Sequence, residues 1–310
     1  MSLPADFSAA IAAWLAARPL AAGRRDASAA LSATYRAGGS SKAVDLASYL
    51  VARLPATYAA VARVLAELAA RKPEFFPESL LDAGSGPGTA SWAAAAVWPS
   101  LERITFLDNA PEFLKLAAEL AQHGPGPLAR AQARAGSIEA MGEGVSADLV
   151  IAAYALAELP LQRADQLASE LWRASASVLV LVEPGTPQGF ARIRAARGAL
   201  LAQGAVPAAP CPHALACPIA GEDWCHFSVR LARSRAHMHA KAAHVPFEDE
   251  KFAYLVMTRE GEPCGGGRII APPQHAKPGV TFRLCAEGRI ENRAIARRQG
   301  ALYKLSLIHI

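Results

Sequence analysis

The chain has 310 residues and a mass of 32.5 kDa, with 52% hydrophobic and 19% charged residues, which is enough apolar material for one large core or two coupled ones. This composition excludes a mainly disordered protein, and no window holds the roughly 18 uninterrupted apolar residues of a membrane-spanning helix. The net charge of +5 is unevenly divided, because residues 1–189 hold 15 basic and 18 acidic residues, whereas residues 190–310 hold 17 and 9. We therefore expect a soluble protein without a membrane partner, whose surface for binding polyanions lies in the C-terminal part.

Residues 1–72 carry apolar residues at helical spacing and predict a helical N-terminal region with a polar break at Gly38–Ser41. From residue 73 to 204, short apolar runs alternate with helical segments, which predicts a Rossmann-like α/β domain with a doubly wound parallel sheet. The expected strands are Ser79–Asp82, Arg103–Asp108, Ala131–Ala135, Ala147–Ala153 and Ser177–Glu183, and the expected helices lie near 88–96, 111–122, 162–175 and 188–203.

The remaining chain differs in texture. Residues 205–250 predict a Cys- and His-rich insert that leads into a basic helix, and residues 251–310 predict the final strands of the sheet and a C-terminal β-hairpin. Phe252–Arg259 and Arg268–Ala271 are expected to be strands joined by a glycine-rich turn. The hairpin is expected to join 281–286 to 289–296 through the turn dipeptide Glu287-Gly288.

A glycine motif follows the first expected strand, in which Asp82 precedes glycines at 84, 86 and 88 and a helix begins next. Alternating glycines allow a sharp turn and a close approach of a ligand to the backbone. No Gly-Lys-Ser/Thr follows, so the motif is not a P-loop, and it resembles the first motif of class I S-adenosylmethionine-dependent methyltransferases.

Asp108 supports this interpretation, because it ends the second expected strand about 20 residues after the glycines, where a carboxylate can accept both ribose hydroxyls. The predicted cofactor-binding residues are thus Asp82, Gly84, Gly86, Gly88 and Asp108, with Ser137, Ile138 and Glu139 positioned beside an adenine ring. The alternative is a glycine turn kept for packing, with Asp108 as a surface cap.

The sequence does not assign a catalytic residue. The end of the fourth expected strand reads Ala152 to Glu158, without an Asn/Asp-Pro-Pro-aromatic run that would bind an exocyclic amine, and no cysteine nucleophile precedes Cys211. Tyr154 and Glu158 either face the pocket or are a packed ring and a solvated carboxylate.

All five cysteines lie between residues 211 and 285. No signal segment precedes them, so we expect a reducing cytoplasm and a metal or catalytic role rather than disulfides. Cys211, Cys217 and Cys225 lie within 15 residues, and Cys264, Cys285, His213 and His226 are candidates for a fourth ligand. The wide spacing favours an iron–sulfur cluster over zinc, and unligated buried thiols are the third possibility.

Basic residues continue after the cysteines and recur on the last hairpin. A basic helix beside a metal-bound loop is typical of a phosphate-binding face, so RNA rather than DNA is the expected partner. The alternative is a solvated charged helix. The residues are Arg230, Arg233, Arg235, His237, His239, Lys241, His244, Arg283, Arg289, Arg293, Arg297 and Arg298.

Five segments together resemble the family of methyltransferase-like proteins associated with the small ribosomal subunit, whose mitochondrial members are assembly factors. The most specific is the block from Cys-Pro-His at 211 to Asp-Trp-Cys-His-Phe ending at 227. The others are Tyr49 to Tyr58, the glycine motif at 82–88, Glu183 to Pro187 and Phe247 to Phe252.

This resemblance implies binding to small-subunit ribosomal RNA during assembly and a methyltransferase fold that holds S-adenosylmethionine. It also implies a [4Fe-4S] cluster on Cys211, Cys217, Cys225 and Cys285, with the last preferred to Cys264 because the family's fourth cysteine lies on a late hairpin. The chain departs from the family at its end, because relatives continue past Tyr303-Lys304 with a basic tail. A catalytically inactive RNA-binding assembly factor and a small-molecule methyltransferase with a zinc-stabilised insert are the alternatives.

Overall fold

The computed structural model describes residues 2–18, 45–142, 144–240 and 244–301. The expected break at Gly38–Ser41, Lys241 and the ending 302–310 lie outside the described residues, as does the side chain of His239. The N-terminal region contains helices α1 (Ala5–Ala16), α3 (Leu46–Ala52) and α4 (Leu54–Arg71). Among the described helices, none is long and apolar enough to cross a membrane.

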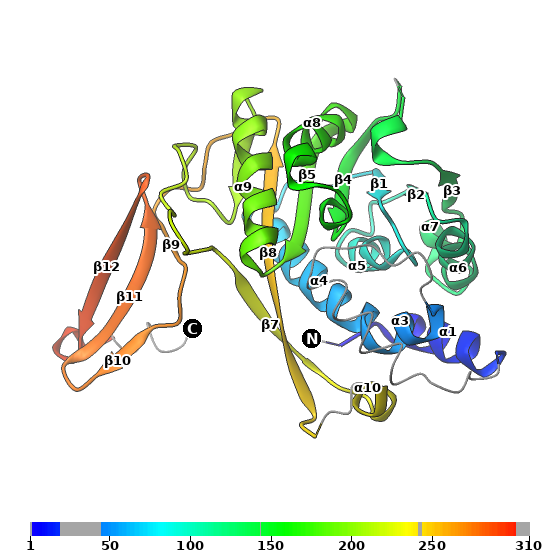
Figure 1. Ribbon diagram of the computed structural model, residues 1–310, viewed down its shortest axis with the longest axis horizontal. Coiled ribbons are helices and arrows are strands. Elements are labelled where there is room, and N and C mark those ends of the chain that lie inside the picture. The colour runs from blue at the N-terminus through cyan, green and yellow to red at the C-terminus, as the bar shows by residue number, and fades with distance from the viewer. Residues whose placement is uncertain (1, 19–44, 143, 241–243, 302–310) are drawn as a thin grey trace.

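The central sheet has eight strands in the order β3-β2-β1-β4-β5-β8-β6, with β7 paired to β8 (Figure 1). Strands β1 to β5 are parallel, whereas β8 runs antiparallel between β5 and β6. This is the class I methyltransferase topology, so the predicted fold class is confirmed. The strands are β1 (Ser79–Ala83), β2 (Arg103–Asp108), β3 (Gln132–Ala135), β4 (Ala147–Ala153), β5 (Ser175–Pro184), β6 (Val206–Ala209), β7 (Phe227–Ala232) and β8 (Phe247–Thr258).

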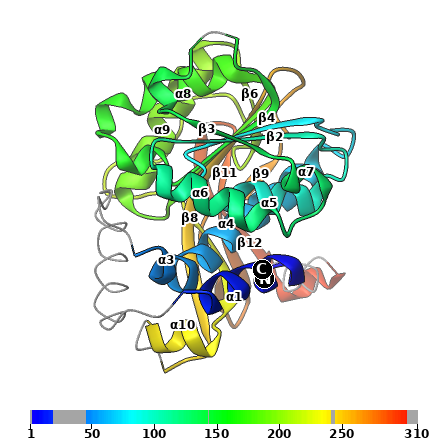
Figure 2. The ribbon, with the colours of Figure 1, turned by 90° about the vertical axis from the view of Figure 1, so that its right-hand side faces the viewer.

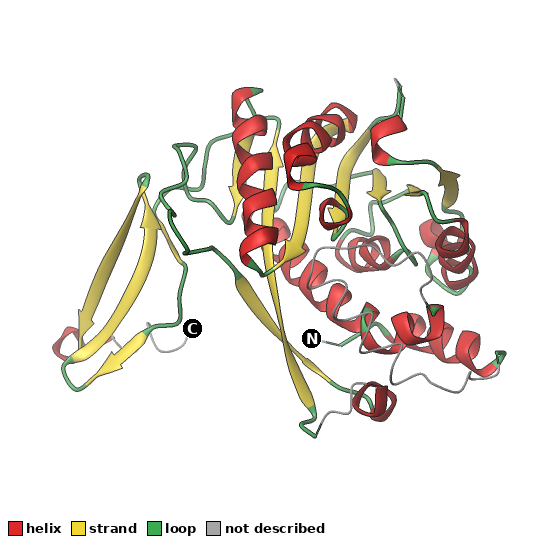
Figure 3. Cartoon of the chain, viewed as in Figure 1, coloured by secondary structure: helices red, strands yellow, loops and turns green. Residues whose placement is uncertain are grey.

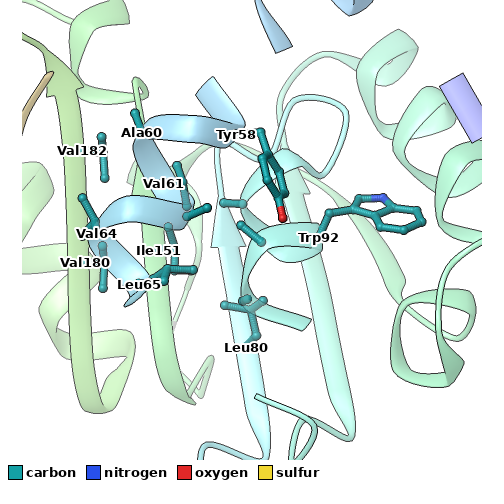
Figure 4. Close-up of a cluster of buried hydrophobic side chains, with 14 of the residues drawn as sticks. Tyr58, Ala60, Val61, Val64, Leu65, Leu80, Trp92, Ile151, Val180 and Val182 are labelled. Atoms are coloured by element: carbon teal, nitrogen blue, oxygen red, sulfur yellow. The ribbon is translucent and has the colours of Figure 1, made fainter. Parts of the chain in front are cut away.

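Helices cover both faces of this sheet (Figure 2). On one face lie α4, α5 (Thr89–Val97), α6 (Pro111–Ala121) and the short α7 (Gly126–Ala129), and on the other lie α8 (Ala164–Ala174) and α9 (Pro187–Ala202). Because side chains alternate along a strand, Leu80 and Leu81 enter opposite cores. Figure 4 shows the first core, where Val61 and Leu65 of α4 lie over Ile151 of β4.

Strand β8 is longer than the sequence predicts, and its first half leaves the central sheet. Phe247–Phe252 pair with β7 as an antiparallel ribbon, whereas Phe252–Thr258 pair with β5 (Figure 1). The expectation of a basic helix is therefore wrong for Arg230, which lies on β7, and the helix α10 is confined to Arg235–Ala240. The reason is cross-strand charge pairing, since Arg230 forms a bidentate ion pair with Asp249 of β8.

The C-terminal segment forms a second, four-stranded antiparallel sheet rather than an isolated hairpin (Figure 3). The hairpin around Glu287-Gly288 is confirmed as β11 (Gly279–Ala286) and β12 (Arg289–Ala296). Strands β9 (Gly267–Ile269) and β10 (Gln274–Ala276) both pair with β11. The expected strands at 252–259 and 268–271 correspond to β8 and β9, which belong to different sheets.

Candidate functional site

A cavity of about 500 Å³ lies at the carboxyl ends of β1, β2, β3 and β4. In an open α/β sheet this edge is the usual place for a ligand, because loops that leave neighbouring strands diverge there. The predicted residues Gly84, Gly86 and Asp108 line it, together with Ser137, Ile138 and Glu139. The remaining lining residues are Tyr49, Asn109, Ala110, Pro111, Glu112, Phe113, Gly136, Ala153, Tyr154, Ala155, Glu158 and Leu159.

The glycine turn approaches its neighbours too closely for side chains. Gly84, Gly86 and Gly88 have φ values of 70°, 51° and 77°, which L-residues rarely adopt. A Cβ on Gly84 would lie 2.7 Å from that of Ala155, and one on Gly88 would lie 3.1 Å from the Phe106 ring. Gly84 and Gly86 therefore keep the cavity floor open, whereas Gly88 allows α5 to begin against the sheet.

The carboxylate of Asp108 holds the shape of this turn. Its Oδ2 accepts a hydrogen bond from the backbone N–H of Gly86 at 2.7 Å, and its Oδ1 accepts one from Ala110 at 2.9 Å. Burial raises the pKa of Asp108, although these donors oppose the shift. Asp108 therefore lines the cavity as the sequence predicts, and its contact to the glycine turn is an additional finding of the structure.

Asp82 lies beneath the turn and is 1% exposed. It accepts hydrogen bonds from the backbone N–H and the hydroxyl of Ser91, at 3.0 and 2.8 Å, which ties β1 to the first turn of α5. Burial raises its pKa to about 7, against the lowering effect of Ser91. The structure thus separates the five predicted residues: three line the cavity, and Asp82 and Gly88 support it from behind.

Sequence reasoning missed the contribution of the N-terminal region to this cavity. Tyr49 of α3 packs edge-on against Phe113 of α6 at 5.1 Å, and both line the cavity. Burial raises the pKa of Tyr49 to about 12. No local pattern announces this contact, because it joins residues 64 positions apart, and only the resemblance of the segment from Tyr49 to Tyr58 drew attention to it.

Tyr154 and Glu158 both line the cavity, yet Tyr154 is also a packed ring that is 5% exposed and Glu158 is an exposed carboxylate, so each of the two expectations holds in part. Glu158 reaches solvent through the opening, yet the surrounding walls raise its pKa to about 7, and the charge of Asp108 adds to this shift. The acidic lining consists of Asp108, Glu112, Glu139 and Glu158, and no Lys, Arg or His is among the described lining residues. The cavity therefore favours a ligand with positive charge.

Four cysteines meet at a second, smaller cavity of about 40 Å³ between α9, β8 and the second sheet. Cys211, Cys217, Cys225 and Cys285 all line it, whereas Cys264 is exposed and lies outside it. Within the described part of the chain, no group of three or more His, Cys, Asp or Glu residues is arranged to hold a metal ion. The cysteine set predicted from the resemblance is nevertheless brought together.

Three arginines line the cysteine cavity, Arg194, Arg197 and Arg268. Arg197 of α9 is 4% exposed, and its Nη2 donates hydrogen bonds to the carbonyls of His213 and Leu215, at 2.8 and 2.7 Å. Burial raises the pKa of Cys211, although Arg197 opposes this shift, and burial raises that of Cys285 to about 11. Such neutral thiols release their protons when they bind a metal, and the guanidinium of Arg197 would then face the resulting thiolates.

The candidate RNA-binding arginines are largely paired with carboxylates. Arg230 and Arg233 pair with Asp249 and Glu248 on the ribbon, and Arg283 pairs with Asp223. Each arginine of β12 forms an ion pair with the glutamate two positions before it, Arg289 with Glu287 and Arg293 with Glu291. The pairs of Arg230 and Arg289 are exposed and therefore weak, so a phosphate can compete for them, whereas Arg233 and Glu248 are largely buried.

The chain is similar in sequence to proteins named for the mitochondrial ribosome. Residues 43–307 match the family described as "Mitochondrial small ribosomal subunit Rsm22". The chain is 31% identical over 296 residues to the human ribosome assembly protein METTL17, mitochondrial, a match that covers 84% of this chain and 60% of that protein. Rsm22-cox11 tandem protein 2, mitochondrial, from Schizosaccharomyces pombe is 28% identical over 315 residues, with coverage of 84% and 41%. This chain thus spans about half the length of these relatives.

Solved structures are more distant. Magnesium protoporphyrin IX methyltransferase from Synechocystis with bound SAM has a TM-score of 0.45 and 16% identity, covering 78% of this chain and all of that one. Precorrin-6y C5,15-methyltransferase from Geobacter metallireducens has a TM-score of 0.41 and 16% identity, covering 63% and 87%. The strand order of the central sheet establishes the fold, and sequence similarity establishes the family. The match over residues 43–307, together with 31% identity to METTL17, shows that the chain belongs to the mitochondrial small ribosomal subunit Rsm22 family.

Proposed function

We propose that this chain binds S-adenosylmethionine in the acidic cavity and acts on small-subunit ribosomal RNA during ribosome assembly. The observation that carries the proposal is the cavity itself, where Gly84, Gly86 and Asp108 meet at the carboxyl edge of the sheet. Its acidic walls suit a sulfonium, which is a cation. The printed names of METTL17 and Rsm22 support the ribosomal part of the proposal.

Cofactor binding is tested by titration calorimetry with S-adenosylmethionine on the wild type and on Gly86→Arg. Arginine at this position fills the cavity floor, so we expect binding to be lost. Gly204→Arg is the matched control, because Gly204 also has a positive φ of 80° but has no atom within 4 Å of its would-be Cβ and lies outside the cavity. Wild-type protein that does not bind the cofactor would contradict the proposal.

Methyl transfer is a separate part of the proposal, since the cavity assigns no catalytic base. Transfer needs chiefly in-line positioning of the acceptor, so the lack of a base is compatible with it. Incubating the protein with labelled cofactor and immature small subunits distinguishes an active methyltransferase from an inactive assembly factor. Incorporation into RNA supports an enzyme, whereas cofactor binding without incorporation supports an inactive assembly factor.

We also propose that Cys211, Cys217, Cys225 and Cys285 hold a [4Fe-4S] cluster, with zinc as the alternative metal. Their convergence on one cavity, with Arg197 beside Cys211, supports this assignment. Three of the ligands belong to the loop between β6 and β7 and the fourth to β11. Such a cluster would therefore join the insert to the second sheet.

Metal analysis after anaerobic purification tests the cluster. We expect a brown protein whose iron is lost in Cys285→Ser and retained in Cys264→Ser, the matched control at an exposed cysteine. A colourless protein with stoichiometric zinc would replace the cluster by zinc.

RNA binding is tested by titrating small-subunit ribosomal RNA at increasing salt. Because arginine–phosphate contacts release counterions, we expect the affinity to fall steeply between about 50 and 200 mM salt. The absence of RNA affinity even at low salt would favour the small-molecule methyltransferase. A cytoplasmic location stays a prediction, since the relatives are named as mitochondrial.

A further inference from the structure

Tyr154 stands at the end of β4 in a backbone conformation that a bulky residue rarely adopts. Its φ is 62°, and a residue keeps such a strained backbone conformation only when its surroundings hold it. The next residue, Ala155, closes the cavity floor against Gly84. The conformation of Tyr154 therefore decides where the wall and the floor of the cavity meet.

Three contacts hold Tyr154 in place. Its backbone N–H donates to the carbonyl of Val182 at 2.7 Å, and its hydroxyl donates to Oε1 of Glu250 at 2.9 Å. The guanidinium of Arg53 lies 4.4 Å from the centre of its ring and pairs with the same Oε1 of Glu250 at 3.0 Å. The result is a closed triad of Arg53, Tyr154 and Glu250.

The triad is well shielded from water. Tyr154 is 5% exposed, and the side chains of Arg53 and Glu250 are 14% and 12% exposed. Its members come from the junction of α3 and α4, from β4 and from the ribbon half of β8. A shielded ion pair with an added hydroxyl is costly to break, because removing one partner leaves the others short of contacts.

We propose that Tyr154 is a positioning residue, which the Arg53–Glu250 pair holds in its strained conformation so that Ala155 and Gly84 form the floor on which the cofactor rests. This inference depends on the proposed binding of S-adenosylmethionine. The hydroxyl of Tyr154 acts through the backbone, since it is bound to Glu250. The same triad also fixes the base of the ribbon against the cofactor cavity.

The test is the dissociation constant for S-adenosylmethionine in Tyr154→Phe, Glu250→Gln and the double variant, with the thermal midpoint of each. Losing the hydroxyl should weaken cofactor binding about tenfold, which corresponds to about 1.4 kcal/mol. Glu250→Gln keeps an acceptor oxygen and should weaken binding less. Because both changes act on one triad, the double variant should bind the cofactor as weakly as Tyr154→Phe alone. Independent sites would instead weaken binding by the product of the two single effects.

Ser79→Ala is the matched control. The Ser79 hydroxyl also donates to a carboxylate, Oδ2 of Asp148 at 2.8 Å. This bond joins β1 to β4 at the ends of these strands that lie away from the cofactor cavity. We expect this variant to lose stability without a change in cofactor affinity. If Tyr154→Phe keeps wild-type affinity, or Ser79→Ala weakens binding equally, the positioning role is wrong while cofactor binding stands. Wild-type protein without affinity overturns both.

Discussion

Glu183, near the end of β5, is a carboxyl group with 0% exposure. Its Oε1 accepts a hydrogen bond from the backbone N–H of Leu156 at 3.0 Å, while Oε2 has no partner among the described residues. Burial raises its pKa to about 8, although the nearby Arg192 opposes the shift. Glu183 is therefore protonated in the folded chain at pH values where the unfolded chain has already lost this proton.

This difference predicts a particular pH dependence of stability. Between the ordinary pKa of 4.5 and about 8, the folded state binds more protons than the unfolded state, so the free energy of unfolding falls as pH rises. The contribution of this one group approaches about 1.4 kcal/mol per pH unit. Glu183→Gln removes the titration and should flatten that slope, which urea unfolding at pH 5 to 8 measures.

The control for Glu183 is the same substitution at Glu102, whose side chain is 69% exposed. Glu102→Gln should follow the wild-type profile. Equal slopes in wild type and Glu183→Gln would mean that Glu183 does not carry the pH dependence.

The predictability of this protein differs between its elements. Strands β1, β2, β4 and β5 and their helices were foreseeable, because each is a short apolar run or amphipathic segment whose period is visible locally. The first half of β8 was not, because Phe247–Phe252 is mostly charged and is stabilised as a strand by the ion pair with Arg230 of β7. The glycines at the cavity edge were likewise foreseeable, because they form one continuous sequence motif. The contact of Tyr49 with Phe113 was not, because it depends on tertiary packing.

Leu231 is a buried anchor of the ribbon of β7 and β8. Leu231 of β7 is 2% exposed and packs against Ala56 and Ala59 of α4. Leu231→Ala leaves a cavity there and should cost about 2–3 kcal/mol locally. Because the second half of β8 stays in the central sheet, we expect the ribbon to open on its own.

Hydrogen exchange measures this local opening. Amides of β7 should exchange about tenfold faster or more in Leu231→Ala, while those of β1 keep their protection. Leu161→Ala is the control, because Leu161 is 40% exposed and lies outside the ribbon. A similar loss of protection in β1 would show that the ribbon unfolds only with the whole molecule.

At the scale of the whole molecule, Arg268 of β9 ties the second sheet to the body. It forms a bidentate ion pair with Glu67 of α4, its Nη2 lies 3.2 Å from the hydroxyl of Tyr254 on β8, and its guanidinium lies 4.6 Å from the centre of the Phe227 ring. Arg268 also lines the cysteine cavity, to which β11 contributes Cys285. Arg268 and Cys285 therefore link the second sheet to the body at the same place.

Arg268→Met should separate the second sheet from the body without unfolding either. Methionine keeps much of the apolar stem but leaves Glu67, whose side chain is 12% exposed, with Arg71 as its ion-pair partner. We expect a loss of about 2–3 kcal/mol, less than for a fully buried pair because Arg71 remains. Thermal unfolding should then divide into two transitions, the first from the second sheet. Arg293→Met, at a β12 arginine that is 66% exposed, should keep the wild-type transition, and a single unshifted transition in Arg268→Met would show that other contacts hold the two sheets together.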